Sequence, residues 1–274
     1  MKFSVLLSVY KKEEPEYLKQ SLESIIDQTR KPDQIVIVKD GELTQELDSI
    51  IKYYYDKYPK IIKIYGYEEN RGLGYALEKG VQQCDYEYIA RMDSDDIAIK
   101  ERFEIQVNYL ENHSDIDILG GYVQEYDEKM QTKIAIRKVP LSNGEIYKKI
   151  GRQCPFNHST VILKKTAVIQ AENYKPQPIE DYRLWIQMCL NKCKMANIPE
   201  VLVNFRTSKK MYQRRSGLKY LHGVKKVEKL LLKYKFINFY QYIENVALRT
   251  ILAIIPSKIK EYVYPKIVRK YEHK

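Results

Sequence analysis

Apolar runs alternate with helical patterns through roughly the first hundred residues. The runs FSVLLSVY, DQIVIVKDG, KIIKIYGY and YEYIARMD predict buried strands beginning near residues 3, 33, 60 and 86. Between them, EPEYLKQSLESIIDQTRKP, LTQELDSIIKYYYDKYP and GLGYALEKGVQQC predict helices; the first places Leu18, Leu22 and Ile25 on one face. This β-α-β-α-β-α-β order predicts an α/β fold, with a parallel sheet covered by helices on both faces.

The second half of the chain mixes both kinds of element. DIDILGGYVQEYDEK and MANIPEVLVNFRT predict strands, whereas NGEIYKKIGRQ and PIEDYRLWIQMCLNKC predict helices. The chain changes character near residue 211, where the pattern becomes helical, strongly basic, and rich in tyrosine, phenylalanine and isoleucine.

Polar clusters follow several of the predicted strands. Ligands of parallel α/β sheets bind beyond the carboxyl ends of the strands, so clusters at those ends are expected to converge on one site. The clusters are Ser8-Val9-Tyr10, Lys39-Asp40-Gly41 and Asp93-Ser94-Asp95-Asp96, and Asn70-Arg71-Gly72 lies in the loop before a helix.

Three carboxylates crowd the turn that follows YEYIARM. Asp93, Asp95 and Asp96 repel one another, and a divalent cation would offset that repulsion. Mg²⁺ and Mn²⁺ prefer oxygen ligands, which these side chains supply. The alternative is that Asp95 or Asp96 caps the following helix, IKERFEIQVNYL, where a negative charge is favoured by the helix dipole.

Composition adds a preference for an anionic partner. The 274 residues include 47 Lys and Arg against 36 Asp and Glu, with a net charge of +11. Such an excess favours nucleic acid, an acidic membrane surface or a phosphate-bearing substrate. The spacing of the four cysteines fits no zinc site or disulfide framework, so free thiols are expected. The N-terminal apolar run is too short for a signal peptide, and no stretch reaches the ~18 to 20 apolar residues of a membrane span, which favours a cytoplasmic protein.

Six segments occur in the order and spacing of a known enzyme family. They are SVLLSVYKKEEPEYLKQSLESIIDQT, QIVIVKDG, ENRGLGYALEKG, YIARMDSDD, FNHSTVILKK and EDYRLWIQM, and they span roughly residues 3–207. The chain thereby resembles a family 2 glycosyltransferase of the GT-A fold, of the bacterial capsular, exopolysaccharide or O-antigen type. The resemblance implies a Rossmann-like, mostly parallel sheet in a catalytic domain over 1–210, with a nucleotide-sugar half (about 1–97) and an acceptor half (about 98–210). The basic helical extension would cover 211–274.

The resemblance also implies a role for each matching polar position on the donor side. Tyr10 would lie against the nucleotide base, and Asp40 would accept a hydrogen bond from uracil. Asp93 would contact the ribose or the metal, Asp95 would ligate Mn²⁺ or Mg²⁺ at the diphosphate, and Asp96 would cap a helix or contact the donor sugar. The full set expected to bind the nucleotide sugar is Ser8, Val9, Tyr10, Asp40, Asn70, Arg71, Gly74, Asp93, Ser94 and Asp95.

Inverting sugar transfer also needs a base for the acceptor hydroxyl, on the opposite face of the donor sugar. The segment EDYRLW supplies Glu180 and Asp181 where the family keeps this base, and Asp181 aligns best. The alternative is that both carboxylates only form the acidic first turn of a helix.

Three further residues are candidates for the site. His158 lies in a segment that the family places beside the acceptor and diphosphate, and it is a candidate third metal ligand. Trp185 either lines the acceptor cleft or fills the core. Arg206, or the basic run KKMYQRR after it, either reaches the diphosphate from a mobile flap or belongs to a solvated basic turn.

Together these features predict an inverting, metal-dependent glycosyltransferase. It would move a hexose or N-acetylhexosamine from a UDP-sugar to a lipid-linked oligosaccharide during cell-surface polysaccharide synthesis. The alternatives are a sugar-nucleotidyltransferase, whose glycine-rich loop after the first strand is missing here, and a basic nucleic-acid-binding protein, for which no binding motif is present. The C-terminal region is expected either to hold the enzyme on the anionic inner face of the cell membrane, or to pack on the catalytic domain or in a homodimer.

Overall fold

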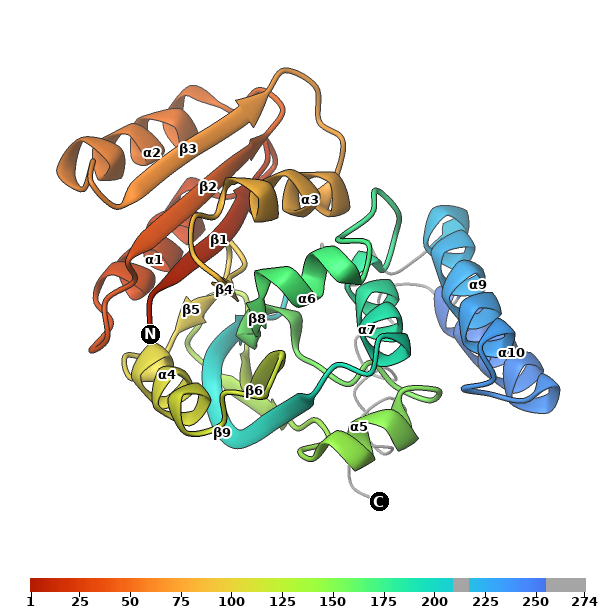
Figure 1. The fold of residues 1–274 in the computed structure, drawn as a ribbon. Coiled ribbons are helices and arrows are strands. Elements are labelled where there is room, and N and C mark those ends of the chain that lie inside the picture. Colours follow the sequence, from red (N-terminus) through yellow and green to blue (C-terminus); the bar gives the residue numbers. More distant parts are fainter. Residues whose placement is uncertain (209–216, 255–274) are drawn as a thin grey trace.

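A curved nine-stranded sheet forms the centre of the protein in the computed structural model, which describes residues 1–208 and 217–254 (Figure 1). The strand order is β3-β2-β1-β4-β8-β6-β9-β5, with β7 beside β6. The strands are β1 (Phe3–Val9), β2 (Gln34–Asp40), β3 (Ile62–Tyr67), β4 (Tyr88–Arg91), β5 (Ile97–Ala98), β6 (Ile118–Tyr126), β7 (Lys133–Arg137), β8 (Ile162–Lys164) and β9 (Met195–Arg206).

The first four strands pair in parallel, as the sequence predicts. β1 lies between β2 and β4 with Val9 opposite Lys39 and Leu6 opposite Arg91, and β3 continues the sheet beyond β2. Because all four run the same way, their carboxyl ends meet at one edge of the sheet. The α/β fold prediction is confirmed.

The second half of the sheet has mixed direction. β8 pairs antiparallel with both β4 and β6, β6 pairs parallel with β9, and β5 and β7 add antiparallel edges. β5 and β7 were not predicted. β5 is only two residues long, and the largely exposed β7 lacks the buried alternation that identifies a strand in a sequence.

Helices cover both faces of the sheet and divide the core into two clusters. Leu6 and Val38 pack against α3 and α7, whereas Val5 and Leu7 point to the other face, towards α1, α2 and α4. The helices are α1 (Pro15–Ile26), α2 (Gln45–Lys57), α3 (Leu73–Gln83), α4 (Arg102–Asn112), α5 (Asn143–Lys149), α6 (Lys165–Gln170), α7 (Glu180–Leu190), α9 (Gly217–Lys233) and α10 (Phe239–Ile254), with a short 3₁₀ turn at His158–Thr160.

The C-terminal helices form a hairpin beside α7, which lies between them and the sheet (Figure 1). Glu228 of α9 is fully buried, and it accepts a hydrogen bond from Asn245 at 2.9 Å and pairs with Arg249 at 3.1 Å, which joins α9 to α10. The helical prediction for 211–274 therefore holds for α9 and α10, and 211–216 and 255–274 lie outside the described residues. No helix within residues 1–208 and 217–254 has the length and apolarity to cross a bilayer. All four cysteines are free thiols, as predicted.

Gly80 lets α3 approach the sheet closely. A Cβ atom at this position would lie 2.3 Å from Leu6 Cδ1 and 3.0 Å from Val38 Cγ2. We predict that Gly80→Ala lowers the free energy of unfolding by about 1 to 3 kcal/mol through overpacking. Gly144→Ala is the matched control, because Gly144 lies in α5 and a Cβ there meets nothing within 4 Å. Urea denaturation should show a loss for Gly80→Ala only; equal stability of both variants would contradict this packing.

Candidate active site

The predicted polar clusters meet at the carboxyl edge of the parallel strands. β1 ends at Val9, which is buried, and Ser8 and Tyr10 on either side are half-buried. β2 ends at Asp40, and β4 ends at Arg91, two residues before Asp93. The sheet thus places the three clusters beside one another, as expected from the strand pattern.

Asp40 organises the loop that faces this edge. Its carboxylate accepts hydrogen bonds from the Tyr67 hydroxyl at 2.8 Å and the Asn70 side-chain amide at 3.0 Å. The backbone N–H groups of Arg71 and Gly72 donate to it at 2.8 and 3.0 Å. In this structure Asp40 therefore holds the loop before α3 in place, and the predicted contact of Asp40 with a uracil ring stays a prediction.

A cavity of about 240 Å³ opens beside this loop. It is bounded by Asn70 from the loop, by Lys11 after β1, and by residues after β2 and β3, namely Glu42, Leu43, Thr44 and Glu68. The adjoining turn requires Gly41, because its φ is +83° and a Cβ there would lie 2.6 Å from Asn70 N. Asn70 is the residue of the predicted donor-binding set that lines this cavity, and the position of the donor nucleotide stays a prediction.

The acid turn after β4 brings its carboxylates together. One oxygen from each of Asp93, Asp95 and Asp96 lies within 4.8 Å of the others. Asp96 is fully buried, and burial together with the charges of Asp95 and Asp93 raises its pKa well above the usual range. A set of three clustered carboxylates fits a hard divalent cation, which would relieve the repulsion that these groups impose on one another.

Asp96 does not cap a helix. α4 begins at Arg102 with Glu101 at its N-cap position, so the prediction that Asp95 or Asp96 caps this helix is wrong. The strand β5 intervenes, and Asp96 instead accepts a hydrogen bond from the backbone N–H of Arg206 at 2.9 Å.

Side chains from distant segments hold the backbone of the acid turn. Ser21 of α1 donates to Asp93 O at 2.8 Å, and the Ser94 hydroxyl donates to Glu13 at 2.6 Å. Arg206 Nε donates to Asp95 O at 2.9 Å. These contacts hold the acid turn in place before any ligand arrives.

Arg206 is fixed rather than mobile. It is the last residue of β9, is 4% exposed, and lies over the Tyr17 ring at 3.8 Å. Its guanidinium also donates to Glu128 O at 2.6 Å and to Gln20 Oε1 at 2.7 Å. The prediction that Arg206 belongs to a mobile flap is therefore wrong, because Arg206 is buried and supports the backbone of the acid turn. The run KKMYQRR extends beyond the described residues.

Arg91 is a site residue that the sequence analysis missed. Its guanidinium is 2% exposed and forms an ion pair with Asp93, and its Nε and Nη1 atoms have no hydrogen-bond partner among the described residues. Arg102 is buried beside it and donates to Arg91 O at 2.8 Å; burial and the charge of Arg91 lower the pKa of Arg102 to about 9. The available signal was a lone cation in the apolar run YIARM.

The amino end of α7 presents two more carboxylates. Ile179 precedes them in the left-handed region (φ 62°), which is rare for a β-branched residue and is typical of strained turns at functional sites. Burial first, and then the charge of Asp181, raise the pKa of Glu180 to about 8; the charge of Arg91 lowers it and that of Asp93 raises it. The acid turn and the start of α7 therefore share one electrostatic environment.

Two residues outside α7 lie close to its amino end, Gly74 of α3 and Cys154. A Cβ on Gly74 would lie 2.1 Å from Lys175 O and 3.2 Å from Glu180 Cβ, so Gly74 allows α3 to lie against the turn before α7. The thiol of Cys154 lies 3.9 Å from Asp181 Oδ2, and burial followed by the charge of Asp181 raises the pKa of that thiol. Gly74 thus has a packing reason beside its predicted place in the donor pocket.

His158 and Trp185 pack together behind this edge. His158 Nε2 lies 3.0 Å from the Tyr174 hydroxyl, and burial and the charge of Arg91 hold its pKa well below the usual range. His158 is outside the cluster formed by the three aspartates, so the structure does not bring it to the metal position predicted for it. Trp185 is 0% exposed and its ring centroid lies 5.3 Å from that of Phe156, which places it in the core rather than along a cleft.

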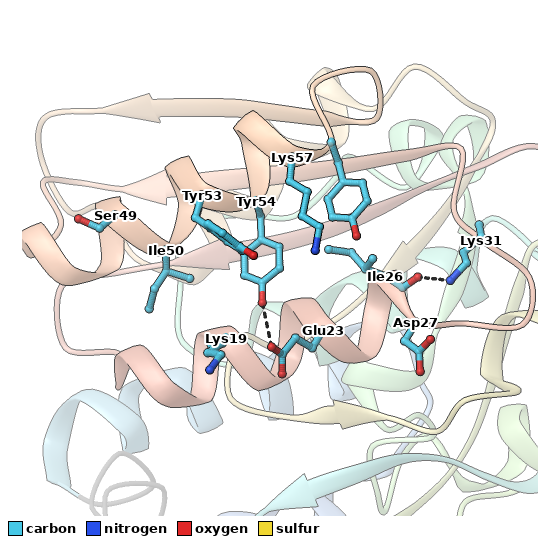
Figure 2. Close-up of a pocket in the computed structure, with 11 residues that line it drawn as sticks. Lys19, Glu23, Ile26, Asp27, Lys31, Ser49, Ile50, Tyr53, Tyr54 and Lys57 are labelled. Atoms are coloured by element: carbon cyan, nitrogen blue, oxygen red, sulfur yellow. Dashed lines mark hydrogen bonds between the residues drawn. The ribbon is translucent and has the colours of Figure 1, made fainter.

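A larger cavity of about 720 Å³ lies between α1 and α2 (Figure 2). Tyr54 donates to Glu23 across it at 3.1 Å, and Lys57 lies over the Tyr53 ring. None of the predicted site residues lines this groove, and the clustered aspartates are not part of it. We therefore place the candidate active site at the carboxyl edge and not here.

Comparison with known proteins identifies the family of the chain. The model of the family described as Glycosyl transferase family 2 matches residues 4–173. The chain is 35% identical to an Escherichia coli UDP-Gal:alpha-D-GlcNAc-diphosphoundecaprenol beta-1,3-galactosyltransferase over 98% of each chain. It is 36% identical to the amylovoran biosynthesis glycosyltransferase AmsE of Erwinia amylovora, over 96% of this chain and 98% of the other.

A solved structure shares the fold. The mannosyltransferase PcManGT of Pyrobaculum calidifontis, in complex with GDP-Man and Mn²⁺, superposes with a TM-score of 0.64 at 12% identity, over 93% of this chain and 70% of that one. The sequence relatives and the family model together decide the classification. The chain belongs to glycosyltransferase family 2 and is a glycosyltransferase.

Proposed function

We propose that the protein is an inverting, metal-dependent enzyme that transfers a hexose or N-acetylhexosamine from a UDP-sugar to a lipid-linked acceptor in cell-surface polysaccharide synthesis. The observation that carries the proposal is the arrangement of two carboxylate groups around one edge. The acid turn follows β4 at the carboxyl edge of the sheet, and the Glu180–Asp181 pair lies at the start of α7, where the charge of Asp93 acts on Glu180. Sugar transfer needs one group of residues to stabilise the leaving diphosphate and another to remove the proton of the acceptor hydroxyl.

The donor nucleotide would occupy the cavity beside Asn70. Asp40 holds the backbone of this loop, so the shape of the cavity is set before the donor binds. Tyr10, which follows β1 and is half-buried, is available to lie against the base. UDP as the nucleotide is supported by the name of the E. coli relative, which specifies UDP-Gal.

Asp93 and Asp95 would hold Mn²⁺ or Mg²⁺, with Asp96 behind them. When bound, the cation neutralises charge on the diphosphate leaving group. The name of the archaeal neighbour includes Mn²⁺. Two arginines position these aspartates: Arg91 forms an ion pair with Asp93, and Arg206 donates a hydrogen bond to Asp95 O.

Asp181 would act as the base. Its carboxylate takes the proton from the acceptor hydroxyl as that oxygen bonds to the anomeric carbon; the bond from the anomeric carbon to the diphosphate breaks, and UDP leaves. Attack from the side opposite the leaving group inverts the anomeric configuration. Burial and the charge of Asp181 raise the pKa of Glu180, which favours a single negative charge on the pair.

The acceptor is expected to be a sugar diphospholipid. The E. coli relative is named for a GlcNAc-diphosphoundecaprenol acceptor, and AmsE is named for amylovoran synthesis. Both relatives align over nearly the whole chain, including the segment with the Glu180–Asp181 pair. A synthetic GlcNAc-diphospholipid, offered with UDP-galactose and Mn²⁺, is therefore the first pair of substrates to test, with UDP release as the readout.

The metal role predicts that Asp95→Ala lowers UDP release in this assay by roughly 10²-fold or more, because charge on the leaving group loses its compensation. Thermal stability should stay the same or rise, since the substitution relieves repulsion within the acid turn. Asp56→Ala, an exposed acid on α2, is the control and should keep full activity. Full activity of Asp95→Ala, or of the wild type in excess EDTA, would refute the metal assignment.

The base role predicts a different pattern for Asp181→Asn. The amide keeps the shape of the side chain but accepts no proton, so turnover should fall about 10² to 10⁴-fold. Binding of UDP, followed by calorimetry, should persist. If Glu180→Gln is inactive and Asp181→Asn is active, the base is Glu180 instead.

The environment of Glu180 predicts a pH-dependent stability. Its pKa is about 8 in the folded chain against 4.5 ordinarily, so between these values the folded state binds more protons than the unfolded state. Wild-type stability should therefore fall as pH rises from about 4.5 to 8, and Glu180→Gln, which does not titrate, should gain stability relative to wild type over this range. Melting temperatures of both proteins across this pH range test it. Glu46→Gln, in the exposed first turn of α2, is the matched control; parallel curves for Glu180→Gln and wild type would contradict the raised pKa of Glu180.

A further inference from the structure

The outer face of α10 carries an apolar stripe that no other part of the described structure covers. Phe239 is 62% exposed, Tyr240 84%, Ile243 50% and Ile251 58%, and Ala247 is also exposed. At about 100° per residue these five positions fall within one arc of about 120° of the helix. We call these five residues the α10 stripe. Glu244 lies just beyond the edge of this arc.

Positive charge lies at the amino end of the stripe. Residues 217–254 contain seven lysines and arginines against two glutamates. Lys233 at the end of α9 and Lys235 in the turn are exposed shortly before Phe239 and Tyr240, and Lys233 lies over the Tyr234 ring at 5.1 Å. Basic groups beside exposed aromatic rings are typical of helices that lie in a membrane interface.

We propose that the α9–α10 hairpin docks the protein on an anionic lipid surface, with the α10 stripe inserted among the headgroups and the neighbouring Lys233 and Lys235 paired with lipid phosphates. Each basic side chain near such a surface adds to the attraction. A second copy of the chain is the less suitable occupant, since two basic hairpins face to face would repel each other. No described helix is able to cross a bilayer, so the hairpin lies on the surface rather than spanning it.

The hairpin packs against the turn that precedes the candidate base and bonds to the loop after α5. A Cβ on Gly223 of α9 would lie 2.5 Å from Pro178 Cβ, and the Asn245 amide of α10 donates to Gly151 O at 3.1 Å. Pro178 precedes Glu180 and Asp181 by only a few residues. Docking of the hairpin would therefore fix the start of α7 near the lipid surface. Lipid binding itself does not depend on the proposed transfer reaction, so each can fail separately.

Vesicle flotation of the full-length protein tests the proposal. The wild type should float with phosphatidylglycerol/phosphatidylcholine vesicles, less so at high salt, and weakly with pure phosphatidylcholine. The triple variant Tyr240→Ser, Ile243→Ser, Ile251→Ser should lower the affinity for anionic vesicles about tenfold or more, because the inserted apolar area is lost. Ile134→Ser with Ile136→Ser is the matched control: both isoleucines are similarly exposed, on β7, and the change should leave flotation unaltered.

Melting temperature and UDP binding establish that each variant is folded. Flotation of the triple variant equal to that of the wild type would overturn the proposal, as would failure of the wild type to float. A third outcome is that the wild type does not float and is dimeric by light scattering, whereas the triple variant is monomeric. That result would assign the α10 stripe to self-association instead.

Discussion

Compensation of buried charge at the carboxyl end of β4 is the constraint on which the candidate site depends. Arg91 and Arg102 are buried there with Asp96, and Asp93 pairs with Arg91 at the edge. A buried charge is costly unless it is paired, so this part of the chain folds only with its cations and carboxylates in register. Asp96 remains incompletely compensated, as its raised pKa indicates, and a divalent cation beside Asp93 and Asp95 would complete the balance.

Segments far away in the sequence stabilise this cluster. Arg206 at the end of β9 and Ser21 of α1 donate hydrogen bonds to the backbone of the acid turn. Gly74 allows α3 to lie against the turn before α7, which brings Glu180 into the field of Arg91 and Asp93. Hydrogen bonds to Asp40 hold the loop before α3, and close packing holds the start of α7. A preorganised active site requires such support. Membership of a glycosyltransferase family favours sugar transfer over the nucleotidyltransferase and nucleic-acid-binding alternatives.

The parallel half of the sheet and the acid turn were predictable because their signals are local. Apolar runs such as QIVIVKD predict buried strands, and carboxylates at the ends of such strands predict a binding site. The errors concern residues whose roles are set by partners far along the chain. Arg206 binds residues 110 and 111 positions away, so its neighbours in the sequence suggested a basic turn instead of a buried support. Arg91 is a similar case, since only the packed structure shows that it pairs with Asp93. For Trp185 the sequence left the acceptor cleft and the core open, and the packed structure decides for the core.

We propose that Asp93 and Asp95 after β4 bind a divalent cation together with the donor diphosphate. Anomalous diffraction from crystals of the protein grown with UDP and Mn²⁺ is the decisive measurement. One strong manganese peak is expected beside the carboxylates of Asp93 and Asp95, in contact with the diphosphate. Fully occupied UDP without such a peak, or a manganese peak elsewhere on the protein, would contradict it.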